Sequence, residues 1–115
     1  MEKDLKILVV DGSRVSRSMI RSTLSTQNNA ERVQVAAVSS AGEALHRLAN
    51  DKYDIITCAL QLPDMYGIDL CRTIRAQPVY RFTPFIVVTA EPHERHMNDG
   101  FRAGGFPDLR LYVDG

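Results

Sequence analysis

The sequence predicts an α/β protein with a doubly wound, parallel five-stranded sheet. Short runs of aliphatic and β-branched residues alternate along the chain with amphipathic stretches in which apolar residues recur at helical spacing. Strands that alternate with helices favour parallel pairing through right-handed crossovers, with helices on both faces of the sheet. In a sheet of this kind the functional site lies outside the carboxyl ends of the strands.

The first strand is expected from Leu5 to Val10, a continuous aliphatic run typical of a strand that is buried on both faces. Ser13 can cap the helix that follows. The inner face of this helix is expected to carry Val15, Met19, Ile20 and Leu24. A second strand is expected from Val33 to Val38, and Ser40 and Glu43 have the spacing of a capping box at the start of a second helix.

The same alternation continues in the second half of the chain. A third buried strand is expected from Tyr53 to Ala59, and Pro63 and Gly67 mark the loop after it. Helical spacing returns from Ile68 to Gln77.

The last expected elements are a fourth strand, a short helix and a fifth strand: Phe85 to Thr89, Pro92 to Ala103 and Leu109 to Val113. A doubly wound domain needs another helix after its fifth strand to cover the sheet, yet the sequence ends at Gly115. Either the chain is cut before that helix, or a partner chain covers the exposed face.

The length and composition indicate one globular domain, residues 1–115. The chain is 44% hydrophobic and 24% charged, and its 14 Lys and Arg balance its 14 Asp and Glu. No global field favours direct binding to nucleic acid, and no apolar run is long enough to span a membrane. With no apolar signal segment at the charged N-terminus, we expect a cytoplasmic location. Cys58 and Cys71 lie in apolar patterns and are expected to be core thiols.

Three segments, in this order and spacing, resemble the receiver domain of two-component response regulators: KILVVDGSRVSRSMIRSTL, YDIITCALQLPDMYGIDLCRTIR and PFIVVTAEP. The resemblance covers nearly the whole chain and implies the flavodoxin-like receiver fold. In that family, two acidic residues end the first strand, an aspartate ends the third, Thr or Ser followed by Ala ends the fourth, and a lysine ends the fifth. The acidic groups hold a magnesium ion, while the third-strand aspartate takes a phosphoryl group from a partner histidine.

Carried over residue by residue, the resemblance implies a degenerate pocket. The first acidic position is Asp11, but the second is Gly12. The phospho-acceptor position is Ala59, which cannot form an acyl phosphate. Thr89 keeps the hydroxyl of the fourth strand, and the lysine position, counted without gaps, falls on Leu111.

This pocket predicts a pseudoreceiver, a receiver-fold signalling module that is not phosphorylated. Arg110 replaces the missing lysine only if the alignment shifts by one residue. We expect no cofactor, magnesium included, because Asp11 alone cannot supply the octahedral oxygen ligands that this ion requires. The chain has no Gly-rich phosphate loop and no nucleophile with a base at the strand ends, so we do not expect an enzyme.

A structural role competes with each functional one at the pocket. Asp11 is either a remnant metal ligand or a turn residue that interacts with the helix dipole, and Thr89 is either a switch hydroxyl or a group bonded to nearby backbone. His93 and His96 are expected to form a solvated surface rather than a metal site, because no further ligand accompanies them except Glu94.

Two features point to protein partners. Arg14, Arg17 and Arg21 recur on one side of the first helix without acidic residues between them, which favours docking of a sensor kinase, a phosphotransfer protein or a fused output domain. A homodimer is also expected, through the surface formed by Pro92 to Phe101 and Leu109 to Val113.

One alternative keeps the domain responsive to a signal. Phosphorylation would then occur at another carboxylate, Asp64 or Asp54, or a small ligand would bind in the crevice that the acidic residues have left.

Overall fold

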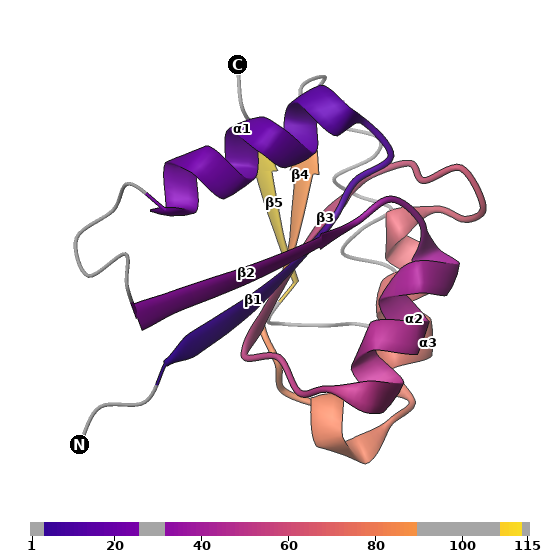
Figure 1. Ribbon diagram of the computed structural model, residues 1–115. Coiled ribbons are helices and arrows are strands. Elements are labelled where there is room, and N and C mark those ends of the chain that lie inside the picture. Colours follow the sequence, from indigo (N-terminus) through magenta and orange to yellow (C-terminus); the bar gives the residue numbers. More distant parts are fainter. Residues whose placement is uncertain (1–3, 26–31, 90–108, 114–115) are drawn as a thin grey trace.

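The chain folds into a parallel sheet of five strands with helices on both faces (Figure 1), and the predicted doubly wound fold is confirmed. The structure, a computed structural model, describes residues 4–25, 32–89 and 109–113. The strands are β1 (Leu5–Val10), β2 (Val33–Val38), β3 (Ile55–Ala59), β4 (Phe85–Thr89) and β5 (Leu109–Val113). Their order, β2-β1-β3-β4-β5, is that of flavodoxin-like sheets. The helix expected from Pro92 to Ala103 lies outside the described residues.

The helices divide between the two faces of the sheet. They are α1 (Arg14–Ser25), α2 (Ala41–Asn50) and α3 (Gly67–Arg75). Figure 1 shows α1 on one face, with α2 and α3 together on the other. Leu8, Ile56 and Val87 of the sheet share a buried core with Leu48 of α2 and Ile74 of α3. This face therefore holds the main core of the domain.

The opposite face is built from the alternate residues of the same strands. The strand register places Val9 beside Thr57, and Thr57 beside Ile86. Val9 and Thr57 are buried, and Ile86 is half-buried. The Thr57 hydroxyl has no hydrogen-bond partner within the part of the chain that the structure describes.

The inner face of α1 differs from the expected one. Ile20 and Leu24 are half-buried against the sheet, but Val15 is 68% exposed and Met19 is 57% exposed. Because an α-helix turns by about 100° per residue, Val15 and Met19 lie well to one side of Ile20 and Leu24. The four apolar residues are too widely spread around the helix for one contact with the sheet to bury them all.

Both predicted helix caps are confirmed. The Ser13 hydroxyl accepts a hydrogen bond from the Ser16 amide (3.2 Å), and the Ser40 hydroxyl accepts one from the Glu43 amide (3.2 Å). The Glu43 carboxylate reaches back to the Ser39 amide, one residue before the helix cap. This carboxylate therefore ties the β2–α2 turn to the helix, and its hydrogen bonds to Ser39 lower the pKa of Glu43.

The third helical stretch ends earlier than expected. α3 stops at Arg75, and a short 3₁₀ helix, η2 (Pro78–Tyr80), follows it. Gln77 takes an extended conformation (φ −92°, ψ 120°) because the ring of Pro78 disfavours the helical region for the residue before it. Tyr80, at the end of η2, is buried and anchors this turn to the core.

Candidate functional site

The carboxyl ends of β1 and β3 bring the predicted pocket residues together. Val10, the last residue of β1, pairs with Cys58 of β3. The next residue of each segment, Asp11 or Ala59, therefore lies at the same level of the sheet. Thr89 closes the adjacent strand β4, one residue after the partner of Ala59. Leu111 lies farther from this edge, because it pairs with Val87 two residues before β5 ends.

Asp11 makes the contacts of a turn residue. Its carboxylate accepts a hydrogen bond from the Ser13 amide (2.9 Å). Its backbone amide donates to Val38 (3.0 Å), and its carbonyl accepts from the guanidinium of Arg17 (2.7 Å). These contacts fix the β1–α1 turn and support the structural role considered for Asp11 in the sequence.

Gly12 faces the loop between β3 and α3 and has little room for a side chain. A Cβ atom at this position would lie 3.2 Å from Cδ of Pro63 and 3.7 Å from the Ser39 carbonyl oxygen. The first of these separations is tighter than ordinary van der Waals contact. The position that carries the second acid in the resembling family is thus a glycine that lies close to a proline ring.

Ala59 lies beneath the start of α3. A Cβ atom at Gly67 would overlap the carbonyl oxygen of Ala59 and would come within 3.1 Å of Sγ of Cys58. Only a residue without a side chain allows so close an approach of helix to strand. Cys58 is buried, and burial raises the pKa of its thiol, with a smaller contribution from Asp11. Cys58 is therefore a protonated core thiol. Cys71 is buried as well.

The carboxylate of Asp64 binds the N-terminus of α2. It accepts hydrogen bonds from the backbone amides of Ala41 (2.9 Å) and Gly42 (2.9 Å). These two bonds lower the pKa of Asp64. The sequence analysis missed this role of Asp64. Its two partners lie 23 and 22 positions earlier in the chain, and no local sequence pattern indicates such a contact.

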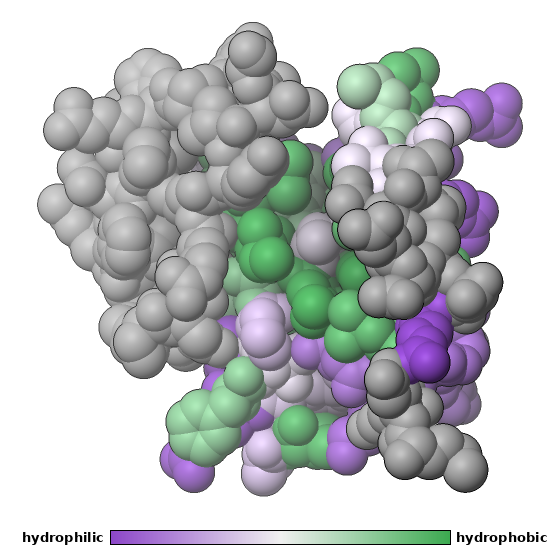
Figure 2. Space-filling model, turned by 90° about the vertical axis from the view of Figure 1, so that its left-hand side faces the viewer, coloured by the Kyte–Doolittle hydropathy of each residue, from purple (hydrophilic) through white to green (hydrophobic). Residues whose placement is uncertain are grey.

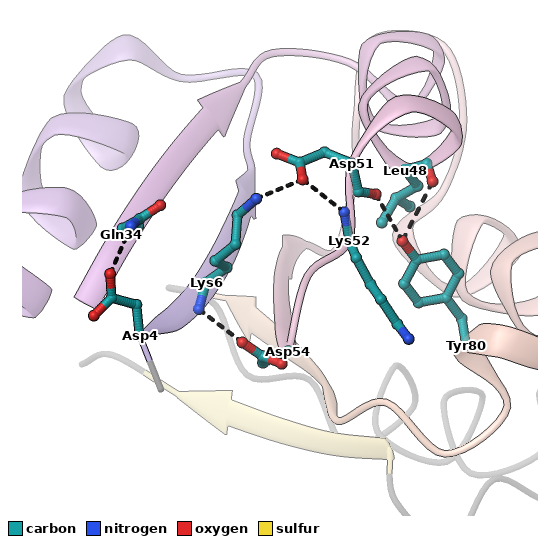
Figure 3. A network of polar contacts seen from close by, with 8 residues as sticks. All are labelled: Asp4, Lys6, Gln34, Leu48, Asp51, Lys52, Asp54 and Tyr80. Atoms are coloured by element: carbon teal, nitrogen blue, oxygen red, sulfur yellow. Dashed lines mark hydrogen bonds and ion pairs between the residues drawn. The ribbon is translucent and has the colours of Figure 1, made fainter. Parts of the chain in front are cut away.

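Asp54 lies at the opposite end of the sheet. It precedes β3, whereas Ala59 ends that strand. Its carboxylate accepts a hydrogen bond from the Lys6 amide (2.9 Å), and Figure 3 shows it beside the first strand, near the contact between Lys6 and Asp51. Asp54 therefore does not belong to the crevice.

Two of the three arginines on α1 donate hydrogen bonds to backbone carbonyl groups of neighbouring segments. Arg17 binds the Asp11 carbonyl, and Arg21 donates to the carbonyl oxygen of Val35 in the edge strand β2 (3.0 Å). Arg14 is exposed. The arginine side of α1 thus faces the β2 edge, and Val15 lies on the other side of the helix.

Figure 2 shows hydrophobic side chains gathered in a hollow in the middle of the view, here called the apolar groove. Its floor follows from the register of β3 and β4 and consists of half-buried Ile55, Ile86 and Val88, together with Thr57. Among the elements that the structure describes, α1 is the only helix that packs on this face of the sheet, over β1 and β2.

The residues at the carboxyl edge do not suit magnesium. Asp11 offers one carboxylate that is already bonded to Ser13, and neither Gly12 nor Ala59 has a side-chain oxygen. Within the described ranges, no three His, Cys, Asp or Glu side chains gather at one place. A divalent cation that demands six oxygen ligands would find too few here.

Comparison with known proteins assigns the family. The family model for the response regulator receiver domain matches residues 7–108. The chain is 34% identical over 101 residues to the transcriptional regulatory protein ResD of Bacillus subtilis, covering 88% of this chain and 39% of ResD. It is 33% identical over 108 residues to protein-glutamate methylesterase/protein-glutamine glutaminase 2 of Paramagnetospirillum magneticum, covering 90% of this chain and 29% of that protein.

Solved structures agree with this assignment. The chemotaxis response regulator CheY4 of Vibrio cholerae superposes with a TM-score of 0.82 at 26% identity, covering 97% of this chain and 88% of CheY4. The chain therefore belongs to the response regulator receiver domain family, and the resemblance found in the sequence is confirmed. It spans less than half the length of ResD and of the methylesterase. No helix within the described residues is long and apolar enough to cross a membrane.

Proposed function

We propose that this receiver domain is not phosphorylated and acts in a two-component pathway by binding a protein partner. The observation that carries the proposal is Ala59 at the carboxyl end of β3, where a methyl group stands beside Asp11. A methyl group offers no nucleophilic oxygen, and a single carboxylate does not assemble a magnesium site. The fold and its surfaces then carry the function, without catalysis and without a cofactor.

The geometry disfavours phosphorylation at another carboxylate. Both oxygens of Asp64 accept hydrogen bonds from α2, and Asp54 lies at the amino end of β3. Each carboxylate is therefore engaged elsewhere, Asp64 with the start of α2 and Asp54 with the Lys6 amide.

Incubation with acetyl phosphate and magnesium tests the proposal directly. We expect an unchanged intact mass, whereas a receiver domain that keeps all its acidic residues serves as the positive control. A mass gain of one phosphoryl group would contradict the proposal, and peptide mapping would then show whether Asp64, Asp54 or another residue carries it. A lower mass gain after Asp64→Asn would identify that aspartate as the acceptor.

The outward surface of α1 fits a partner of defined chemistry. Arg14 is exposed on one side and Val15 and Met19 are exposed on the other, with Ser18 between them. α1 contains no acidic residue. An amphipathic helix with carboxylates along one side and apolar residues along the other complements this surface. A helix of this kind in a sensor kinase, a phosphotransfer protein or a fused output domain is the proposed partner.

Acidic substitutions on α1 test the docking proposal. Arg14→Glu and Met19→Glu should each weaken binding of a phosphotransfer protein at least tenfold, the order expected for a central interface residue. Phe82→Glu is the matched control, since Phe82 is 81% exposed and lies in the α3–β4 connection rather than on α1. Equal effects of all three substitutions would contradict docking on α1. We propose that the domain binds its protein partner in the cytoplasm.

A further inference from the structure

The loop between β3 and α3, residues 60–66, is built as a rigid turn. The Leu62 amide donates to the Met65 carbonyl (2.9 Å), and the Gly67 amide donates to the Leu60 carbonyl (2.8 Å). Leu60 and Leu62 are buried in the main core, so the base of the loop is anchored. Its exposed tip consists of Pro63 and Asp64.

The tip contacts two elements that are remote in the sequence. Pro63 lies against Gly12 in the β1–α1 turn, at the short separation described above. Asp64 binds the first two amides of α2, those of Ala41 and Gly42. The free amides of the first helical turn are thus shared between a local cap, Ser40, and a remote one, Asp64.

We propose that Asp64 is a latch that holds the 60–66 loop closed over the carboxyl end of β3. Because the carboxylate is a polar link between the loop tip and α2, its loss makes the loop open more often, although Leu60 and Leu62 anchor the loop in the closed state. The open loop moves Pro63 away from Gly12 and uncovers the end of β3. This proposal does not depend on whether the domain is phosphorylated.

The buried thiols allow a direct measurement of loop opening. Sγ of Cys58 lies under Gly67, where the loop joins α3, and Cys58 is 1% exposed. Cys71 is buried farther along α3. Opening of the loop should expose Cys58 first, whereas unfolding of the whole domain exposes both thiols.

The experiment compares labelling by an aromatic disulfide reagent in two single-thiol proteins, Cys71→Ala and Cys58→Ala. With Asp64→Ala added, we expect Cys58 to react about tenfold faster, the order expected when a helix cap is lost, and Cys71 to react at an unchanged rate. Asp69→Ala is the matched control, since it removes an exposed carboxylate of α3 that pairs with Arg72 (3.5 Å).

Two results would overturn the latch. Equal acceleration of both thiols would mean that Asp64 only adds to the stability of the whole domain, and an unchanged Cys58 rate would mean that other contacts hold the loop. Asp64→Asn is the second variant if Asp64→Ala does not fold. It keeps one acceptor oxygen for the two amides, so its Cys58 rate should fall between those of the parent and the alanine variant.

Discussion

Gly67 begins α3 directly above the carbonyl oxygen of Ala59, at a separation that leaves no space for a Cβ atom. This contact sets the angle at which the 60–66 loop returns to the sheet, because the Gly67 amide also donates to Leu60. Ala59 at the end of β3 and the glycine that follows the loop are therefore parts of one packing unit.

We expect Gly67→Ala to destabilise the domain by about 3 kcal/mol, since the new methyl group must displace backbone rather than a flexible side chain. Gly42→Ala is the matched control. A Cβ atom there meets only Oδ2 of Asp64 at 3.5 Å and Oγ of Ser40 at 4.0 Å, which are ordinary contacts. This control should be neutral or stabilising by up to about 1 kcal/mol. Urea titration measures both, and equal midpoints would show that the helix can shift to accept the methyl group.

Tyr80 provides a second test of packing at the other end of the sheet. Its buried hydroxyl donates toward the carbonyl oxygens of Leu48 (3.3 Å) and Asp51 (3.0 Å), as Figure 3 shows, and so closes the C-terminal end of α2. Tyr80→Phe should lower the free energy of unfolding by about 1 kcal/mol. Tyr66→Phe should change it little, because Tyr66 is exposed and its hydroxyl has a long contact with Gln61 (3.4 Å). A smaller loss for Tyr80→Phe than for Tyr66→Phe would contradict this role.

The ion pair between Lys6 and Asp51 makes stability depend on pH (Figure 3). The hydrogen bond from Lys6 lowers the pKa of Asp51 below its ordinary value of 3.8, with a further contribution from the Lys52 amide. A lowered pKa in the folded state means that the stabilisation is complete above the ordinary value and is lost as the pH falls through the folded one. The pKa of Lys6 is raised above 10.5 for the same reason, so its share is lost only at higher pH.

We therefore expect urea midpoints to fall less steeply below about pH 4 in Asp51→Asn than in the parent, because the asparagine cannot be protonated in this range. The difference in urea midpoint between the parent and Asp51→Asn at pH 7 should shrink in high salt, since the side chains of Lys6 and Asp51 are both solvent-accessible. Parallel pH profiles for the two proteins would mean that the pair contributes no measurable stability. Asp69→Asn, which alters a carboxylate paired within α3, serves as the control.

Sequence signals were sufficient where structure depends on near neighbours. The apolar runs predicted all five strands, although β3 begins at Ile55 and not at Tyr53, and the spacing of Ser40 and Glu43 predicted the start of α2. Contacts between distant segments left no such signal. Examples are the hydrogen bond that Asp64 accepts from the start of α2 and the one that Tyr80 donates to the Leu48 carbonyl. The pocket positions could be assigned only through the resemblance to receiver domains, because composition and periodicity do not distinguish a phospho-acceptor from any residue at a strand end.

The proposed pseudoreceiver pocket, with Gly12, Ala59 and Leu111 at three family positions, predicts that restoring one position does not restore phosphorylation. Ala59→Asp should remain unmodified by acetyl phosphate, because Gly12 still supplies no metal ligand and the lysine position is Leu111. The thermal midpoint of the parent protein should also be unchanged, within about 1 °C, by millimolar magnesium, since a ligand stabilises a fold only when it binds it. A rise of several degrees, or phosphorylation of the single variant, would show that the remaining residues suffice.

Adding Gly12→Asp to that variant tests the steric part of the argument. A Cβ atom at position 12 would lie 3.2 Å from Cδ of Pro63, so the acid requires a small shift of that ring or of the loop that carries it. We expect the double variant to be less stable than Ala59→Asp alone in the absence of metal, for steric reasons and because the carboxylate added at position 12 is repelled by Asp11 and by the carboxylate introduced at position 59. Equal stability of the two variants would show that the loop shifts without cost.

The groove beside α1 predicts self-association. Ile55, Ile86 and Val88 are half-buried on the α1 face of the sheet, and Val15 and Met19 of α1 are exposed. Large exposed apolar surfaces are uncommon on stable monomers. The predicted interface residues from Pro92 to Phe101, and the side chains of Leu109 to Val113, lie outside what the structure describes. The groove is an independent reason to expect a dimer, and a symmetric one is the commonest form.

Sedimentation at micromolar concentration measures this association. We expect the parent chain to sediment as a dimer and the double variant Val15→Lys/Met19→Lys to shift toward monomer, because two charges at the border of the groove oppose burial of its floor. Val79→Lys/Phe82→Lys is the matched control, since it changes two exposed apolar residues in the α3–β4 connection, away from the groove. A parent chain that sediments as a monomer, or a control that dissociates as fully as the α1 variant, would contradict association through this surface.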